Sequence, residues 1–185
     1  PDDIDAGFVD KLYNGINQKS KKYRISIVGG NITNSKEIVV NVSMIGFVGK
    51  KNLTLRKSAK INDLILCSGD VGKSAVGLEL LKLDKKGKSI KNHIEPECRL
   101  DLAGKLVEVG ISSMIDVSDG VASEVRHICE ESGVGAVIYA DKIPISQNTI
   151  KDAKKLNKNP LDFALYGGED FELIFTANKN KLKQL

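Results

Sequence analysis

Apolar residues recur with the period of a helix in the first part of the chain and in short β-branched runs after it. Residues spaced four apart from Ile4 to Ile16 outline one helical face, which predicts a helix to about Ser20. The runs over 24–28 and 37–48 are rich in Ile and Val and predict two strands. The first part of the chain is therefore expected to hold one helix and two strands.

From residue 63 onward, strand-like and helix-like patterns alternate, which predicts an α/β or α+β architecture. The expected strands are 63–67, the apolar lead-in to Asp116, 136–140 and 171–176. The expected helices are 73–83, a helix from Pro96 to a stop at Gly110, 121–132, 147–156 and a short helical start at the last residues. A basic connector places the expected domain boundary near residues 50–62.

Composition narrows the class of partner. Of the 185 residues, 41% are hydrophobic and 28% are charged, with a net charge of +4 and no Trp, as in an ordinary globular protein. The lysines are scattered and carry few aromatic neighbours, so we expect no nucleic-acid partner. No apolar run reaches the roughly 18 residues of a membrane span, so we expect no membrane partner.

Cysteine usage and the first residues bear on the compartment. Cys67, Cys98 and Cys129 are far apart and form no C-x-x-C pair, which argues against a zinc site or a disulfide framework. We therefore expect a reducing, cytoplasmic location. The chain opens on Pro1 without a basic, apolar leader, which predicts no signal peptide and suggests a fragment or a processed chain.

Two aspartates at a predicted strand-to-helix turn are the strongest chemical signal. Asp116 and Asp119 flank Val117-Ser118 and are followed by Gly120. Carboxylates this close repel one another unless a cation lies between them or both face water. Mg²⁺ is typically held by one or two carboxylates with substrate phosphates and waters, and a helix N-terminus favours a phosphate. A helix cap formed by Ser118 and Asp119 is the alternative, but it leaves Asp116 unexplained.

Two other turns share the form of paired glycines followed by polar residues. Gly29-Gly30-Asn31 ends one predicted strand, and Gly167-Gly168-Glu169-Asp170 precedes another. Paired glycines let a ligand approach the backbone closely, and α/β proteins place ligands at strand ends. The combination of these turns with the twin aspartates is more specific than any of them alone.

Several other motifs favour ordinary structural roles. Gly72-Lys73-Ser74 resembles the end of a phosphate-binding P-loop, but the pattern requires glycine where Cys67 stands, so a tight strand-to-helix turn is preferred. His93 is expected in a loop and His127 on the polar face of a helix, both at the surface. Arg56 lies at the expected domain boundary, where its planar guanidinium could reach a phosphate.

Two long motifs carry a family resemblance. The segments 113–123 with 132–136, and 164–173, closely resemble thiamine-monophosphate kinases. Three further motifs occur in the same order as in that family: Gly29-Gly30-Asn31, Arg56 with Ala59-Lys60, and the segment 69–78. The chain is similar to the family over nearly its whole length.

The resemblance implies a partial two-domain fold of the aminoimidazole-ribonucleotide synthetase-like superfamily. Residues 1–55 would be the C-terminal part of the N-terminal ATP- and Mg²⁺-binding domain, and residues 56–185 most of the C-terminal α/β domain. It also implies a homodimer that uses ATP and Mg²⁺ to convert thiamine monophosphate to thiamine diphosphate by direct in-line transfer, without a side-chain nucleophile.

The resemblance also implies roles for individual residues of the chain. The residues that would contact ATP are Gly30, Asn31, Arg56 and Ser118. The residues that would bind metal are Asn31, Asp116 and Asp119. Glu169 would lie at the substrate end.

Three features leave alternatives open. Asn31 stands where the family typically has aspartate, so one metal is expected to bind more weakly. Cys98 replaces a proline before Arg99, which we interpret as a local packing change. The family's N-terminal metal motif and C-terminal stacking aromatic would lie outside the chain, so we expect the fragment alone to be inactive. The alternatives are a related ATP-using enzyme with another acceptor, or an inactive binding or assembly module.

Overall fold

The first of two units, Pro1–Phe47, is built around a single helix. The computed structural model describes residues 1 and 3–184. Helix α1 covers Ala6–Tyr23 and ends at Arg24, whose φ of 55° is left-handed. The helix predicted from the spacing of apolar residues is therefore confirmed. No helix among the described residues is long and apolar enough to cross a lipid bilayer.

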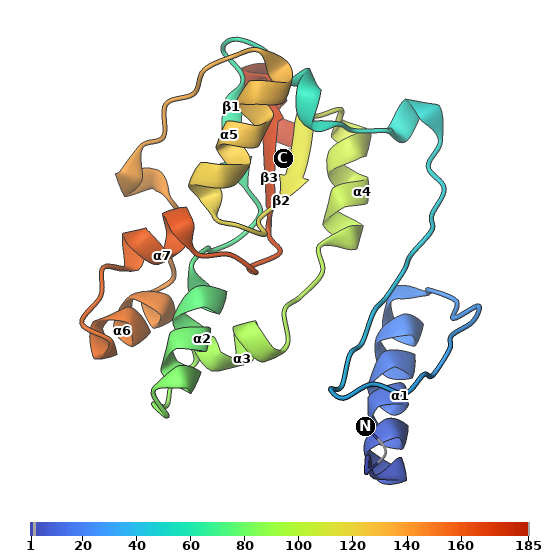
Figure 1. Cartoon of the computed structure of the whole chain (residues 1–185). Coiled ribbons are helices and arrows are strands. Elements are labelled where there is room, and N and C mark those ends of the chain that lie inside the picture. Colours follow the sequence, from blue (N-terminus) through green and yellow to red (C-terminus); the bar gives the residue numbers. More distant parts are fainter. Residues whose placement is uncertain (2, 185) are drawn as a thin grey trace. The chain divides into compact units, whose positions relative to one another are not determined.

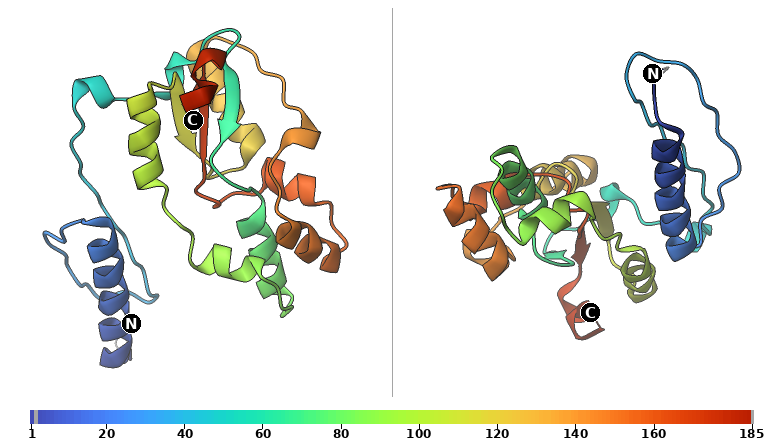
Figure 2. Two further views of the ribbon diagram at one scale, coloured as in Figure 1. Left: turned by 180° about the vertical axis from the view of Figure 1, so that it is seen from behind. Right: turned by 90° about the horizontal axis from the view of Figure 1, so that it is seen from below.

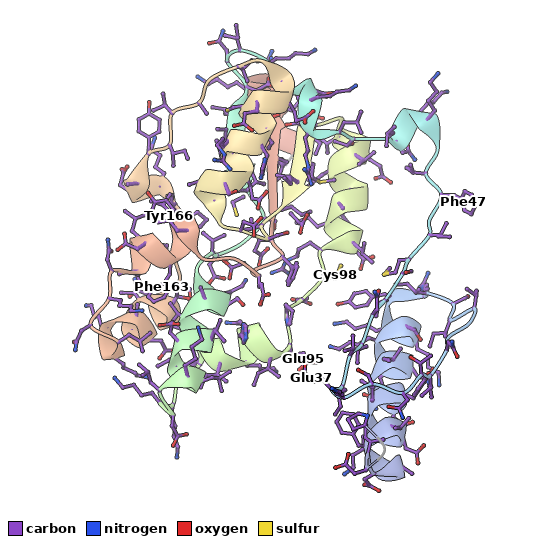
Figure 3. The ribbon with its side chains drawn as sticks, viewed as in Figure 1. Glu37, Phe47, Glu95, Cys98, Phe163 and Tyr166 are labelled. Atoms are coloured by element: carbon purple, nitrogen blue, oxygen red, sulfur yellow. The ribbon has the colours of Figure 1, made fainter. Side chains whose placement is uncertain are left out.

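The two strands predicted in this unit are not formed. Over 25–47 the described chain is extended or bent and pairs with no other strand. Its apolar side chains are largely exposed, and Phe47 projects fully into solvent (Figure 3). The prediction was wrong because β-branched residues favour a strand only where a neighbouring strand satisfies the backbone and a packed face buries the side chains.

The second unit, Val48–Leu185, contains a small antiparallel sheet (Figure 1). Its strands are β1 (Leu64–Cys67), β2 (Ser113–Asp116) and β3 (Leu173–Ala177), in the order β1-β3-β2. Cys67 and Ile115 both lie opposite Ile174 in the register, so β3 is the central strand. The acidic residue Asp116 is the last residue of β2, which places it at an end of the sheet.

Each face of the sheet packs against one helix, as the two views in Figure 2 illustrate. Helix α5 (Val121–Ser132) covers the face that carries Ile115 and Ile174. Helix α4 (Leu100–Val109) covers the opposite face, which carries Met114 and Phe175. Adjacent strand residues point to opposite faces, so both sides of this three-stranded sheet are buried. The α/β class expected from the sequence is confirmed.

Four further helices form a separate cluster beside the sheet (Figure 1). They pack through Val76 and Leu80 of one helix and Ala153 of another, all of which are fully buried. The helices are α2 (Lys73–Lys82), α3 (Ser89–Ile94), α6 (Gln147–Lys155) and α7 (Pro160–Tyr166). This cluster supports the start of α2 and the end of α7, where the candidate site lies.

Some element boundaries differ from those expected. Helix α4 begins at Leu100 rather than Pro96, and residues 136–140 form no strand because no partner strand lies beside them in the described chain. Helices α3 and α7 were not predicted, although Asn159 caps α7 and Pro160 opens it. The remaining elements are short 3₁₀ turns: η1 (Lys50–Asn52), η2 (Arg56–Ser58), η3 (Ala140–Lys142) and η4 (Lys179–Gln184).

Candidate active site

The turn between β2 and α5 presents two exposed carboxylates, those of Asp116 and Asp119. The Ser118 hydroxyl donates to Oδ2 of Asp116 at 2.5 Å. Gly120 has a φ of 102°, a conformation that L side chains rarely adopt, and it lets the chain enter α5 directly. We call residues 116–120 the acidic turn. Its exposed oxygens face solvent and are free to meet a ligand.

A buried glutamate of helix α5 anchors the acidic turn through hydrogen bonds. Glu124, on the first turns of α5, is 2% exposed. Its Oε1 accepts the backbone amides of Asp119 at 2.9 Å and Ser118 at 3.3 Å. The backbone between the two aspartates is therefore anchored to the helix that follows it.

The loop 167–172 packs directly on the acidic turn. The amide of Glu169 donates to the Ser118 carbonyl at 2.9 Å, and the amide of Phe171 donates to the Val117 carbonyl at 3.0 Å. A side chain on Gly168 would clash with the Ser118 carbonyl oxygen. The close approach therefore requires glycine at this position. The two motifs that are most distinctive in the sequence lie side by side.

Glu169 is one of two exposed residues of this loop, the other being Phe171. Glu169 has a φ of 63°, and its side chain is 62% exposed. Its Oε2 lies 3.7 Å from Nδ1 of His93, which also lies 3.0 Å from the Ser74 hydroxyl. His93 belongs to α3 and its side chain is 19% exposed, so the expectation of a surface loop histidine was wrong. Helix α3 was missed in the sequence because its six residues are too short to show a period.

Asp170 turns inward and fills the N-terminus of α2. Its carboxylate accepts the amides of Gly72 at 2.5 Å and Ser74 at 2.8 Å, and the residue is 2% exposed. Burial raises the pKa of Asp170 to about 6, although these amides act in the opposite direction. A P-loop would offer such amides to a phosphate. Here a carboxylate of the chain occupies them, which agrees with the preference for a tight turn.

Glu172 is the centre of a buried ion cluster. It is 1% exposed and accepts Lys73 Nζ at 2.5 Å, Arg99 Nη2 at 2.7 Å and the Ser68 hydroxyl at 2.6 Å. Burial opposes ionisation of Glu172, but hydrogen bonds from Arg99, Lys73 and Ser68 outweigh it and lower its pKa to about 2. This cluster fixes the C-terminal side of the loop, as Asp170 fixes its middle.

The structure brings some predicted site residues together and leaves others apart. Asp116, Ser118, Asp119 and Glu169 all lie on the acidic turn or the loop that packs on it. Gly30 and Asn31 belong to the other unit, within 25–47.

Arg56 lies at the opposite end of α5 from the acidic turn. Its carbonyl accepts the Ser132 hydroxyl at 3.0 Å, and Ser132 is the last residue of this helix. Helix α5 has 12 residues, so its ends are about 18 Å apart. The Arg56 side chain is therefore not part of the acidic-turn cluster within this unit.

The donor set suits a hard cation that is shared with a ligand. Asp116 and Asp119 supply exposed carboxylate oxygens, and the Ser118 hydroxyl lies between them. Among the described residues no group of three or more His, Cys, Asp or Glu side chains could hold a metal alone. Mg²⁺ is usually bound by one or two carboxylates together with waters and substrate phosphates. The residues present therefore fit Mg²⁺ bound with a phosphate ligand.

Three residues that hold the candidate site in place were missed in the sequence: Glu124, Asp170 in its capping role, and Glu172. Glu124 follows Asp119 by five residues, at a helical position that points back to the turn. That spacing is a signal that could have been used. The partners of Asp170 and Glu172 lie nearly 100 residues away in the sequence, so no local pattern indicates them.

Two family models cover most of the chain. Residues 1–48 match the N-terminal domain of AIR synthase related proteins, and residues 62–185 match the C-terminal domain. The chain belongs to the AIR synthase related protein family. The acidic turn and the loop that packs on it both fall in the C-terminal match.

Relatives within this family agree with the resemblance seen in the sequence. A thiamine-monophosphate kinase of Aquifex aeolicus is 34% identical over 98% of this chain and 60% of its own length. One of Pyrococcus abyssi is 33% identical over 100% of this chain and 58% of its own length. The chain thus spans about 60% of the length of these curated relatives.

The fold agrees as well. The structure of AaThiL complexed with AMPPCP and TMP superposes with a TM-score of 0.82 at 31% identity, covering 98% of this chain and 60% of that one. The resemblance to thiamine-monophosphate kinases is confirmed.

Proposed function

We propose that the protein to which this chain belongs transfers the γ-phosphoryl group of ATP to thiamine monophosphate, giving thiamine diphosphate and ADP. The observation that carries the proposal is the acidic turn, with Asp116 and Asp119 exposed and fixed at a strand end. It is supported by the similarity to AaThiL, which is complexed with AMPPCP and TMP. Phosphoryl transfer needs alignment and charge neutralisation more than covalent chemistry.

The proposed roles follow from where the side chains lie. Asp116 and Asp119 would hold Mg²⁺, which when bound neutralises phosphate charge and orients phosphate oxygens. Ser118, whose hydroxyl is bonded to Asp116, would keep that carboxylate in one orientation and contact the nucleotide. Glu169, exposed on the adjoining loop, would face the thiamine-phosphate end. An oxygen of the acceptor phosphate attacks directly, so no protein nucleophile is required.

The proposal extends to the residues outside the acidic turn. Gly30 and Asn31 would contact ATP, and Asn31 would also bind metal through its carbonyl oxygen, more weakly than a carboxylate would. Arg56 would contact ATP phosphates. These three roles rest on the resemblance alone, because this unit places Arg56 near the far end of α5 and the other unit carries Gly30 and Asn31.

A homodimer in the cytoplasm completes the proposal. The dimer follows from the resemblance to thiamine-monophosphate kinases. The cytoplasm is supported by the spacing of the three cysteines in the sequence, which form no C-x-x-C pair, as is usual in a reducing compartment.

The test is thiamine diphosphate formation by the full-length protein with ATP, Mg²⁺ and thiamine monophosphate. We expect product from the wild type and a loss of at least about 100-fold in Asp116→Asn, since the interaction removed is an electrostatic one at the reacting phosphates. Glu130→Gln is the matched control, because Glu130 is an exposed carboxylate on α5 far from the turn. A folded full-length protein that makes no product would exclude this acceptor and favour another ATP-dependent reaction or a binding role.

A further inference from the structure

Glu124 is a buried carboxylate whose position a simple helix cap does not explain. It is 2% exposed, and within the described chain no basic side chain lies in salt-bridge range of it. Its Oε1 instead accepts the backbone amides of Ser118 and Asp119. Burying a carboxyl group carries a desolvation cost, so its contacts call for an explanation.

The direction of these contacts separates Glu124 from a cap. A capping side chain satisfies amides of the first helical turn, which here begins at Val121. Glu124 instead reaches past Gly120 to amides outside the helix, between the two exposed aspartates. Its hydrogen bonds therefore restrain the acidic turn rather than complete the helix.

Two independent restraints meet at the same residue. Glu124 holds the Ser118 amide from the helix side, and the Ser118 carbonyl accepts the Glu169 amide from the loop side. The backbone between Asp116 and Asp119 is thus fixed on both sides. Groups that orient metal-binding side chains typically contribute 10–100-fold to metal affinity.

We propose that Glu124 is a positioning residue that fixes the acidic turn, so that the carboxylates of Asp116 and Asp119 stay oriented for binding divalent cations. This inference rests on the proposed function for the metal pair but not on the identity of the phosphate acceptor. Loss of the Glu124 carboxylate lets the turn relax, so the two aspartates lose their fixed orientation and divalent cations bind more weakly. The fold persists, because the helix face of α5 carries its own core residues Val125 and Ile128.

The test is direct Mn²⁺ binding, measured by electron paramagnetic resonance of free Mn²⁺ on the full-length protein with AMPPCP present. We expect the Mn²⁺ dissociation constant to rise about tenfold in Glu124→Ala, and by less in Glu124→Gln, which retains an acceptor oxygen. Glu124→Asp keeps a carboxyl group but falls short of the amides, so it is expected to behave like Glu124→Ala. This variant also keeps most of the buried volume, which guards against unfolding.

Asp152→Asn is the matched control. Asp152 is likewise a buried carboxylate, 3% exposed, that accepts a backbone amide at a helix start, that of Ser89 at 2.9 Å. It lies outside the acidic turn, so its variant is expected to lose stability and keep the wild-type Mn²⁺ affinity.

The outcomes separate this inference from the proposed function. An unchanged Mn²⁺ affinity in Glu124→Ala and Glu124→Asp, with a lower unfolding temperature, would reduce Glu124 to a structural anchor and overturn the inference. A wild type that binds no Mn²⁺ would overturn it as well. A wild type that binds Mn²⁺ but makes no thiamine diphosphate would overturn the proposed reaction alone, and the weaker binding of the variants would still support the role of Glu124.

Discussion

Replacing Glu172 by glutamine removes the charge at the centre of the buried ion cluster and leaves its shape. Lys73 and Arg99 then lose the carboxylate that both of them contact. The side chain of Lys73 is 12% exposed, so water compensates for little of this loss. We therefore expect a clear fall in the free energy of unfolding.

The magnitude can be obtained in two ways. The pKa of Glu172 is lowered from 4.5 to about 2. Since each pKa unit corresponds to about 1.4 kcal/mol, ionised Glu172 contributes roughly 3 kcal/mol at pH 7. Removal of one partner from a buried ion pair costs about 3–5 kcal/mol in other proteins. The two values agree on a loss of about 3 kcal/mol for Glu172→Gln.

The assay is urea denaturation of the full-length protein at a series of pH values. Because the folded pKa is the lower one, the stabilisation is complete above about pH 5 and disappears as the pH falls toward 2. The difference between wild type and Glu172→Gln should shrink over this window. Glu97→Gln is the control, since Glu97 pairs with the same Arg99 at 3.1 Å but is 63% exposed; its expected cost is about 0.2–1 kcal/mol. A loss in Glu172→Gln no larger than that of the control would refute the reasoning.

Three further predictions follow from other contacts. Gly168→Ala forces the loop away from the Ser118 carbonyl and should lower both the stability of the protein and its Mn²⁺ affinity. Gly104→Ala is the control, because Gly104 lies in open space within α4; it should stabilise the protein by about 0.5–1 kcal/mol in thermal unfolding. For Asp170 the folded pKa of about 6 lies above the ordinary 3.8, so its contribution to the free energy of unfolding rises as the pH falls from 6 toward 4. Asp170→Asn should abolish this part of the pH dependence in denaturant titrations. An unaltered pH dependence in the variant would contradict the assignment. Leu80→Ala, at a fully buried position, should cost about 2–5 kcal/mol in the same titrations, and a loss under about 1 kcal/mol would show that the helical cluster packs loosely.

Local signals account for what the sequence predicted correctly. Helices α1, α2, α5 and α6 lie close to their expected ranges because their period and their ends are written in neighbouring residues. Asp116, Ser118 and Asp119 could be selected together because they share one turn. The association of this turn with Glu169 was suggested by the shared form of the two turns and by the family resemblance, and the backbone hydrogen bonds between them now provide its physical basis.

Long-range partnerships account for what the sequence did not show. The segments 24–28, 37–48 and 136–140 have strand-like composition, but a strand forms only with a partner, which composition does not specify. In the same way, Asp170 and Glu172 look like parts of an exposed acidic motif. Their burial depends on amides and cations that come from α2 and from the segment before α4.

The order of strands in the sheet has a consequence for how the protein is made. Within the described residues, β1 and β2 each pair with β3 alone, and β3 is the last of the three to be synthesised. Until β3 emerges from the ribosome, both earlier strands lack this partner, and the acidic turn lacks the loop that packs on it. The loop 167–172 leads directly into β3, so closure of the sheet is coupled to the packing of this loop on the acidic turn. A nascent chain halted before the loop would carry both aspartates with the Glu124 restraint but without the restraint that the loop supplies.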